Sequence, residues 1–229
     1  MKITKGKCFV ILGSLLLLAA AILILSNIIQ DKKSGERARE VLEVLEVKIS
    51  DEAKKSEEAE TKVQTSTEQI YTAPSEDLFA QYGTEEPTTQ EKLAEIDGNS
   101  YVGIISIPSL DVRLPVMSEW SYANLKISPC RYSGRADTDD IIIAAHNYSS
   151  HFGNINSLSV GDEMVFIAAD GTEYRYNVIQ IDTLDGTDVE GLITNNDGNW
   201  DLTLFTCTLS GQSRVCVRAE KSDLSGDTE

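Results

Sequence analysis

The sequence predicts a mainly β domain, folded as a closed or nearly closed antiparallel barrel, that follows an apolar helix and an acidic stalk. Three observations lead to this prediction. An almost uninterrupted apolar run stands near the N-terminus, and a charged segment poor in apolar residues follows it. From Tyr101 onward, short runs of β-forming residues alternate with turn residues, a pattern that is typical of barrels built from short strands.

The apolar run, residues 8–29, matches the length of a membrane-spanning helix, which needs about 20 residues. Three lysines and no acid precede it, which favours a cytoplasmic N-terminus, although Lys32 and Lys33 on the far side weaken this orientation. A cleaved signal peptide is the alternative, but the run exceeds the roughly 7–15 residues of a typical signal core. We therefore expect residues 1–30 to form a cytoplasmic tail and an uncleaved transmembrane anchor, with the rest of the chain outside the cell.

Residues 31–98 are expected to form an acidic juxtamembrane stalk. Between residues 36 and 62 an apolar residue recurs every four positions, at Val41, Leu45, Ile49 and Ala53. Because this stripe is thin, a solvated helix is expected there, with a weak self-association segment as the alternative. Between residues 63 and 97 Thr, Ser, Glu, Gln and Pro dominate, which favours disorder.

The net charge of -17 argues against nucleic acid as a partner, because no part of the chain supplies a basic stripe. Acidic residues outnumber basic ones most strongly between residues 36 and 97, so the charge describes the stalk more than the barrel. We place the barrel domain at residues 99–221 and expect residues 222–229 to form a disordered tail.

Seven runs of β-forming residues are expected to become the strands of the barrel. These runs are 102–108, 111–116, 140–145, 163–168, 173–181, 202–206 and 214–219. Turn residues separate them, most clearly at 169–172, 194–199 and 210–212. Helix is expected only as short turns, at 121–126, 151–157 and 188–194.

The four cysteines do not predict a disulfide framework. Cys8 lies in the apolar run, which leaves an odd number, Cys130, Cys207 and Cys216, outside it. At least one of these thiols should therefore be free or paired between molecules. For Cys130 and Cys216 the preferred interpretation is a small buried hydrophobic side chain, and a disulfide between them stays open.

Residue types suited to acyl transfer stand at or near the ends of predicted strands. Cys207 ends one run, Arg214 opens the next, and His146, one of only two histidines, follows an apolar run. A free cysteine has a pKa of about 8.5, so its thiol needs a nearby imidazole or cation to become a nucleophile at neutral pH. His146 can also transfer protons, and Arg214 can hold a developing oxyanion. The Thr206 hydroxyl and the Thr208 backbone N–H are further candidate donors to a substrate carbonyl.

Each of these signals alone has a simpler interpretation. A cysteine at a strand end is more often structural, and a histidine after an apolar strand is more often a surface residue. The combination gains weight because histidine is scarce in this chain and because the domain is expected to lie outside the cell.

A wider sequence resemblance surrounds these residues. Leu202-Thr-Leu-Phe-Thr-Cys207 resembles the TLxTC signature of the sortases, the membrane-anchored cysteine transpeptidases of Gram-positive bacteria. Residues 103–116 are similar to the family's opening strand pair, and Ala144-Ala-His146-Asn is similar to the segment around its catalytic histidine. Arg214-Val-Cys-Val-Arg218 resembles the last strand, which begins with the catalytic arginine. The resemblance covers roughly residues 100–220, in the family's order and spacing.

The resemblance implies a sortase fold, a closed antiparallel or mixed β-barrel of about eight strands with short helices. It implies that Cys207, His146 and Arg214 are catalytic and lie at one end of a groove that binds a Leu-Pro-x-Thr-Gly-like sorting signal of a secreted protein. Cys207 would form a thioester, which an amine of a peptidoglycan cross-bridge or a pilin lysine would resolve. No cofactor is expected. The resting protonation of Cys207 and His146 stays open, because coupled sites titrate as a pair.

Two residues compete for the catalytic roles. Arg218 shares a strand face with Arg214, but the family's pattern places the catalytic arginine at the start of the strand. His151 competes with His146, but it lacks the match to the Ala-Ala-His segment. We therefore prefer Arg214 and His146.

The sortase class stays open, with class A or D favoured. The stretch from residue 181 to residue 201 is short for the helix-bearing insertion of class B, and the Asp-Pro-aromatic lid of class C is missing before Tyr101. Two groups of acids could form a Ca²⁺ site, as in some class A members, although solvated loop acids are the preferred interpretation. These groups are Asp137, Asp139 and Asp140, and Asp185, Asp188 and Glu190.

Two other functions stay open. The first is an extracellular cysteine peptidase, which would use the same groups with water as the acceptor. The second is a non-enzymatic, surface-anchored binding barrel. The presence of all three candidate catalytic residues argues against the second.

Overall fold

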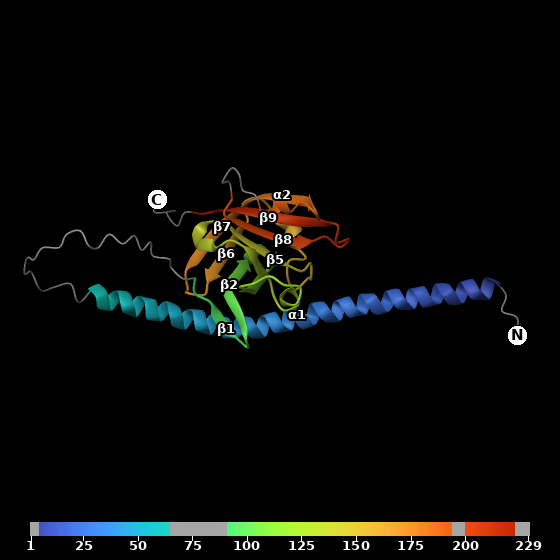
Figure 1. Cartoon of the computed structure of the whole chain (residues 1–229), viewed down its shortest axis with the longest axis horizontal. Helices are drawn as coiled ribbons and strands as arrows, with labels where there is room; N and C mark the ends of the chain where they lie inside the picture. The colour runs from blue at the N-terminus through green and yellow to red at the C-terminus, as the bar shows by residue number, and fades with distance from the viewer. Residues whose placement is uncertain (1–4, 65–90, 194–199, 223–229) are drawn as a thin grey trace, which may run out of the picture.

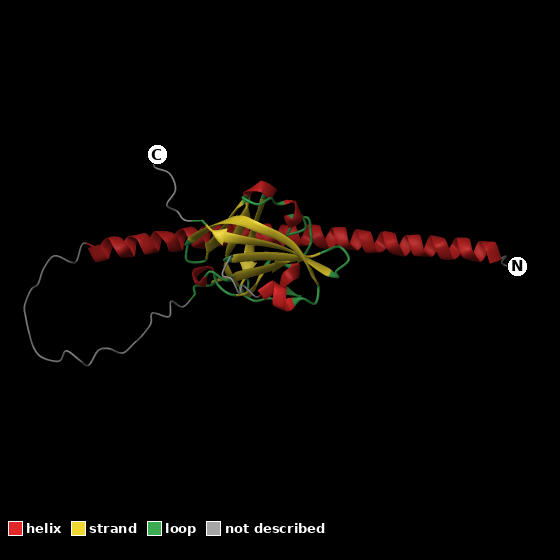
Figure 2. Ribbon diagram, turned by 90° about the horizontal axis from the view of Figure 1, so that it is seen from above, coloured by secondary structure: helices red, strands yellow, loops and turns green. Residues whose placement is uncertain are grey.

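The computed structural model describes residues 5–64, 91–193 and 200–222 of the chain. One long helix, α1 (Lys5–Gln64), passes along the side of a β-barrel, which lies beside the middle of the helix (Figure 1). The N-terminal, apolar part of α1 extends away from the barrel in both views (Figures 1 and 2). Disorder was predicted for residues 63–97 and 222–229, and of these residues 65–90 and 223–229 lie outside the described residues, as does the turn predicted at 194–199. Within the described part the prediction is wrong, because α1 continues to Gln64 and residues 94–96 form a strand.

Part of α1 is long and apolar enough to cross a membrane. The candidate span falls within Phe9–Lys55, and its most apolar window has a mean hydropathy of 2.8 with no buried side chains. An exposed surface of this kind is unfavourable in water and favourable in lipid. The N-terminal apolar helix therefore suggests membrane anchoring.

Nine strands follow α1 in the described chain. They are β1 (Ala94–Ile96), β2 (Asn99–Ile107), β3 (Val112–Met117), β4 (Cys130–Ser133), β5 (Ile141–Ala145), β6 (Glu163–Ala168), β7 (Glu173–Asp185), β8 (Leu202–Cys207) and β9 (Ser213–Lys221). The short helices are α2 (Val189–Ile193) and the 3-10 turns η1 (Pro108–Leu110), η2 (Asn124–Lys126), η3 (Ala136–Thr138) and η4 (Ile155–Ser157). Each of the seven predicted runs forms a strand, and η2, η4 and α2 fall in the three predicted helical segments.

Eight of these strands close into a barrel. Their order around it is β2-β3-β4-β5-β8-β9-β7-β6, and β6 pairs back with β2. The pairs β3–β4 and β5–β8 are parallel, while the others are antiparallel. The prediction of a closed, mixed barrel of about eight strands is confirmed.

The strands that will carry the site are buried on both faces. Leu204 of β8 and Ile143 of β5 point into the barrel, where they join the interior core. The alternate residues Phe205 and Ala144 point outward and join a second apolar cluster on the outer face. Burial on both faces explains why β5 is a continuous apolar run rather than an alternating one.

One stripe of α1 covers part of this outer face. Leu45 and Ile49 are buried in the outer cluster together with Ile96 of β1 and Met117 of β3, the two strands on which α1 packs. Fully burying a leucine side chain contributes roughly 1.5–3 kcal/mol, so this contact holds the helix on the barrel. The expectation of a solvated helix is wrong for this stripe, because the outer face of the barrel supplies an apolar surface that sequence periodicity alone does not show.

Two strands were not predicted from the sequence. β4 mixes polar and apolar residues, and its pairing with β3 and β5 completes the ring. β1 forms a hairpin with β2 and begins at Ala94, five residues before the predicted start of the barrel domain. Both strands are short, so neither has a recognisable alternation of its own.

Candidate active site

The strand register brings three of the predicted residues to one end of the barrel. Ala145 of β5 pairs in parallel with Thr206 of β8, so the next residues, His146 and Cys207, leave the same edge of the sheet side by side. In the antiparallel β8–β9 pair, Cys207 lies directly opposite Arg214. A thiol, an imidazole and a guanidinium thus come from three adjacent strands, β5, β8 and β9, which Figure 1 shows together.

Cys207 is the accessible thiol of the barrel. It is free and half-buried, whereas Cys130 and Cys216 are free and fully buried. Burial raises the pKa of Cys130 to about 12 and that of Cys216 to about 11. A thiolate is the reactive form of cysteine, so these two thiols are poor nucleophiles at neutral pH.

Cys130 and Cys216 are also too far apart to form a disulfide. Cys130 pairs with Ala144, which pairs with Phe205, which pairs with Cys216. Three strand spacings of about 4.8 Å separate the two residues by roughly 14 Å. A disulfide needs Cα atoms within about 7 Å, so both remain buried thiols as preferred from the sequence.

His146 has a half-buried imidazole. Its Nε2 atom is buried and has no hydrogen-bond partner among the described residues. Burial lowers the pKa of His146, and the positive charge of Lys126 lowers it further. The ring packs against Tyr148, with 4.8 Å between the two ring centroids. An imidazole nitrogen without a hydrogen-bond partner is suited to accept a proton.

Arg214 keeps its guanidinium available for a ligand. Its Nη1 atom makes only long hydrogen bonds, to the carbonyls of Gly211 at 3.4 Å and Ser213 at 3.5 Å. Within the described residues it forms no ion pair. The side chain is therefore a cation beside Cys207 whose donors are not committed to a carboxylate.

The guanidinium of the rival arginine, Arg218, is already in contact with other groups of the protein. Its side chain is buried, and its Nη2 atom donates a 2.6 Å hydrogen bond to the carbonyl of Gly191 in α2. The guanidinium also stacks over the Trp200 ring at 4.0 Å and lies 3.9 Å from Asp182. Arg218 thus holds α2 and its neighbours on the barrel.

The rival histidine, His151, is likewise buried and faces another partner. Its Nε2 atom lies 3.1 Å from the hydroxyl of Ser34 on α1. Burial is the main cause that lowers its pKa, to about 4. His151 therefore belongs to the contact between α1 and the barrel.

Thr206 and Thr208, the two predicted donors, are both engaged within the barrel. The Thr206 hydroxyl donates to the carbonyl of Ala145 at 2.9 Å, which ties the ends of β5 and β8 together. The Thr208 N–H donates to the carbonyl of Ser213 at 2.9 Å and closes the β8–β9 hairpin. An oxyanion would have to compete with these carbonyls for either donor.

A row of aromatic side chains leads from solvent toward the site. Phe205, two residues before Cys207 on the same strand face, packs edge-on against Tyr132 at 5.4 Å. Tyr132 contacts Trp120 at 5.9 Å, and Trp120 contacts the exposed Tyr122 at 5.1 Å. Sequence reasoning missed this row because three of its members lie in segments without periodicity. The signal available in the sequence was the alternation of side chains along a strand, which places Phe205 on the same face as Cys207.

The acidic groups considered for Ca²⁺ are engaged locally. Asp137 pairs with Arg135, Asp139 pairs with Lys221, and Asp140 accepts the N–H of Arg135. Asp185 and Asp188 accept backbone N–H groups of the loop around α2. No group of three or more His, Cys, Asp or Glu side chains in the described part of the chain is placed to hold a metal ion.

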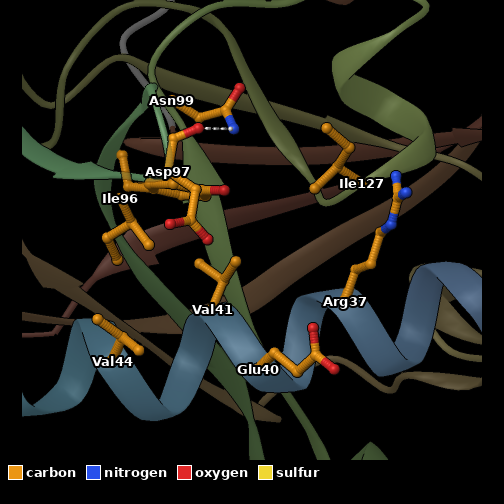
Figure 3. Close-up of a pocket in the computed structure, with 9 residues that line it drawn as sticks. Arg37, Glu40, Val41, Val44, Ile96, Asp97, Asn99 and Ile127 are labelled. Atoms are coloured by element: carbon orange, nitrogen blue, oxygen red, sulfur yellow. Dashed lines mark hydrogen bonds between the residues drawn. The ribbon is translucent and has the colours of Figure 1, made fainter.

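A cavity of roughly 330 Å³ lies elsewhere, between α1 and the β1–β2 hairpin (Figure 3). Its lining residues are Arg37, Glu40, Val41, Val44, Ile96, Asp97, Asn99, Tyr101 and Ile127. The Tyr101 hydroxyl is buried there without a partner among the described residues, and burial raises its pKa to about 12. None of the three candidate catalytic residues lines this cavity, so it is separate from the site.

Several solved structures are similar to this chain. They include sortase A from Corynebacterium diphtheriae, at 25% identity and a TM-score of 0.49, over 57% of this chain and 64% of that one. Sortase C1 from Streptococcus agalactiae has 28% identity and a TM-score of 0.49, over 56% and 71% of the two chains. Clostridium perfringens sortase C with the C-terminal cell wall sorting motif has 24% identity and a TM-score of 0.49, over 59% and 75%.

The family match decides the assignment. This chain spans slightly less than two thirds of the Corynebacterium diphtheriae sortase A chain. No curated protein sequence matches it. Residues 105–222, just over half of the chain, match the sortase domain family. This protein therefore belongs to the sortase family.

Proposed function

We propose that this protein is a cysteine transpeptidase that cleaves a Leu-Pro-x-Thr-Gly-like sorting signal near the C-terminus of a secreted protein and transfers the acyl group to an amine. The observation that carries the proposal is the register of β5, β8 and β9, which sets His146 and Arg214 on either side of Cys207. Membership of the sortase family supports the same reaction class.

The first half-reaction would form a thioester. The Cys207 thiol gives its proton to the free Nε2 of His146, and the sulfur attacks the carbonyl carbon before the scissile bond. Arg214 donates hydrogen bonds to the oxyanion, which is the role its uncommitted guanidinium suits. The imidazolium of His146 then protonates the leaving amine, the C–N bond breaks, and the acyl group stays on sulfur.

The second half-reaction would use the same groups in reverse. An incoming amine gives its proton to neutral His146 as it attacks the thioester carbon, and Cys207 leaves as the thiolate. The lowered pKa of His146 favours the neutral form that this step requires. An amine of a peptidoglycan cross-bridge, or a pilin lysine, would be the acceptor, and water as the acceptor would make the protein a peptidase instead.

The aromatic row gives the proposed substrate a surface. Leucine and proline side chains of a sorting signal are apolar and would pack against Phe205 and Tyr132, with Trp120 and Tyr122 at the exposed end. Aromatic side chains provide large, rigid contact areas for this kind of recognition. This arrangement would place the scissile carbonyl beside Cys207.

The anchor sets where the reaction would occur. We propose that the N-terminus is cytoplasmic, that the apolar part of α1 crosses the membrane once, and that the barrel lies outside a Gram-positive cell. In both overall views the tip of the β8–β9 hairpin points the same way as the apolar half of α1 (Figures 1 and 2). The catalytic end would therefore face the membrane surface. A class A- or D-like anchoring enzyme that needs no cofactor fits these features best.

The test is product analysis with the full-length protein in detergent micelles. A panel of peptides that carry sorting-signal variants is incubated with and without an oligoglycine or a lysine-bearing peptide as the amine. We expect cleavage between the last two motif residues and a new product that joins the N-terminal fragment to the amine. Cleavage without any amine-linked product would assign the protein as a peptidase.

Matched cysteine variants identify the nucleophile. Cys207→Ala should abolish peptide consumption, whereas Cys216→Ala, which changes a buried thiol on the neighbouring strand, should keep it. A thioester adduct of the mass of the acyl fragment should appear on Cys207 before amine is added. Consumption that survives Cys207→Ala would show that the assigned nucleophile is wrong.

A further inference from the structure

The anchor helix contacts the loop that begins at His146 as soon as its apolar run ends. The Asp31 carboxylate accepts the N–H groups of Ser149 at 3.0 Å and Ser150 at 3.1 Å. It also accepts the hydroxyls of both serines, and the Asp31 carbonyl lies 3.1 Å from the Ser150 hydroxyl. One carboxylate on α1 thus holds two successive residues of this loop.

Ser34, one turn further along α1, ties two segments of the barrel together. It is buried, and its hydroxyl donates to the carbonyl of Lys126 at 2.7 Å while lying 3.1 Å from His151 Nε2. Because a hydroxyl has one proton, the second bond requires the His151 Nε2–H to be the donor. Gly35 permits this close approach, since a Cβ there would lie 2.8 Å from the Ser150 Cβ.

The segments that α1 holds are those that border the His146 ring. The Tyr148 ring packs on His146 at 4.8 Å and on His151 at 5.6 Å. Lys126, whose carbonyl Ser34 binds, is the charge that acts on His146. The described hydrogen bonds of the side chains from Tyr148 to His151 all run to α1, to Gln30, Asp31 or Ser34.

We propose that Asp31 and Ser34 are positioning residues for His146, so that the membrane anchor is also a structural part of the active site. This inference rests on the proposed role of His146 as the proton carrier of Cys207. The loop from residue 147 to residue 151 has no strand partner, and its remaining hydrogen bonds are local turns. Without α1, the loop and the Tyr148 ring would be free to move, and the imidazole beside Cys207 would lose its fixed orientation.

The experiment compares variants of the full chain in lipid nanodiscs by two measurements. The first is the rate of Cys207 alkylation by iodoacetamide between pH 5 and pH 10, followed by mass spectrometry of the Cys207 peptide. It reports the coupled titration of Cys207 and His146 and needs no substrate. The second is kcat and KM on a sorting-signal peptide with an amine acceptor.

Asp31→Ala and Ser34→Ala should shift the pH midpoint of alkylation and lower kcat about tenfold, with KM changed less than about twofold. Asp31→Asn keeps a neutral acceptor for the serines and should give a smaller change in the same direction. Glu36→Ala removes an exposed acid of the same helix and should match the wild type in both measurements.

Leu45→Ala separates positioning from simple attachment of the helix. It removes packing of α1 on the outer cluster over β1 and β3, at a contact separate from the loop, and should lower the thermal midpoint while leaving the alkylation midpoint unchanged. The inference is wrong if Asp31→Ala and Ser34→Ala leave the alkylation profile unchanged, or if Leu45→Ala shifts it equally. If no peptide is processed but Asp31→Ala shifts the profile, the positioning role stands and the proposed substrate is wrong.

Discussion

Two cross-strand pairs on the outer face of the β8–β9 hairpin have similar compositions and opposite roles. Cys207 faces Arg214 at one end, and Thr203 faces Arg218 four residues further along each strand. Both arginines project from the same strand face. The pairs differ in what lies over them.

The Arg218 end is covered and the Arg214 end is not. α2 and Trp200 lie over Arg218, which donates to the carbonyl of Gly191 and lies 3.9 Å from the Asp182 carboxylate. Arg214 has only long hydrogen bonds to its own hairpin. A cation acts on a substrate only if its donors are not already satisfied. What covers a strand face, more than the residue types on it, therefore decides where chemistry is possible.

The largest expected effect on kcat comes from replacing Arg214, with Arg218 as its counterpart. Arg214→Ala should lower kcat by roughly 10²–10³-fold, the range for removing one oxyanion donor, because the oxyanion loses its main unoccupied donor. Its thermal midpoint should stay near that of the wild type, since the guanidinium makes no short contact. Steady-state kinetics on the sorting-signal peptide and a thermal scan would measure both effects.

Arg218→Ala is the matched control and should behave in the opposite way. It should destabilise the fold by about 1–3 kcal/mol, because the Gly191 carbonyl and Asp182 lose a charged partner. The kcat of the folded fraction should change little. If Arg218→Ala lowers kcat as much as Arg214→Ala, both arginines act on the substrate and the contrast between the two ends does not hold.

The two histidines make the stability of the fold depend on pH. His151 is covered by α1, and burial lowers its pKa to about 4. The unfolded chain, with a histidine pKa near 6.5, binds the proton first as the pH falls. Stability should therefore be lost between pH 6.5 and about 4, by about 3 kcal/mol in total. Denaturant unfolding followed by tryptophan fluorescence across this range would measure the loss.

His151→Gln tests the source of this loss. Glutamine can still donate to Ser34 but does not titrate, so the acid slope between pH 6.5 and 4 should become shallower. His146 also has a lowered pKa and contributes a smaller slope of the same sign. A slope that is unchanged in His151→Gln would contradict the assignment to His151.

The sequence predicted the barrel well because strands leave a local pattern. All seven β-forming runs became strands, and their turns carry the expected residues. The pairing partners leave no such pattern, so β4 and the attachment of α1 were not predicted. The stripe at Leu45 and Ile49 was visible, but its partner surface on the outer face of the barrel exists only after the barrel has closed.

The candidate site likewise has residues that the sequence predicts and residues that it does not. Cys207, His146 and Arg214 were recognisable from strand ends and from the family resemblance, and the register places them together. The aromatic row and the contacts of Asp31 come from segments up to 119 residues apart. Such contacts depend on tertiary packing, which local sequence does not encode.

Two threonines of β8 give the smallest and most closely matched contrast. Thr203 and Thr206 are both buried, but only the Thr206 hydroxyl has a hydrogen-bond partner, the Ala145 carbonyl, within the described residues. Thr206→Val should destabilise the fold by about 1 kcal/mol, because a bond that joins β5 to β8 is lost. Thr203→Val should be neutral or stabilising by up to about 1 kcal/mol, because it removes a hydroxyl that is buried without a partner. Denaturant unfolding of both variants measures the difference directly. Equal destabilisation would mean that the Thr206 bond does not hold the strand ends together, and that the register beside Cys207 depends on the backbone ladder alone.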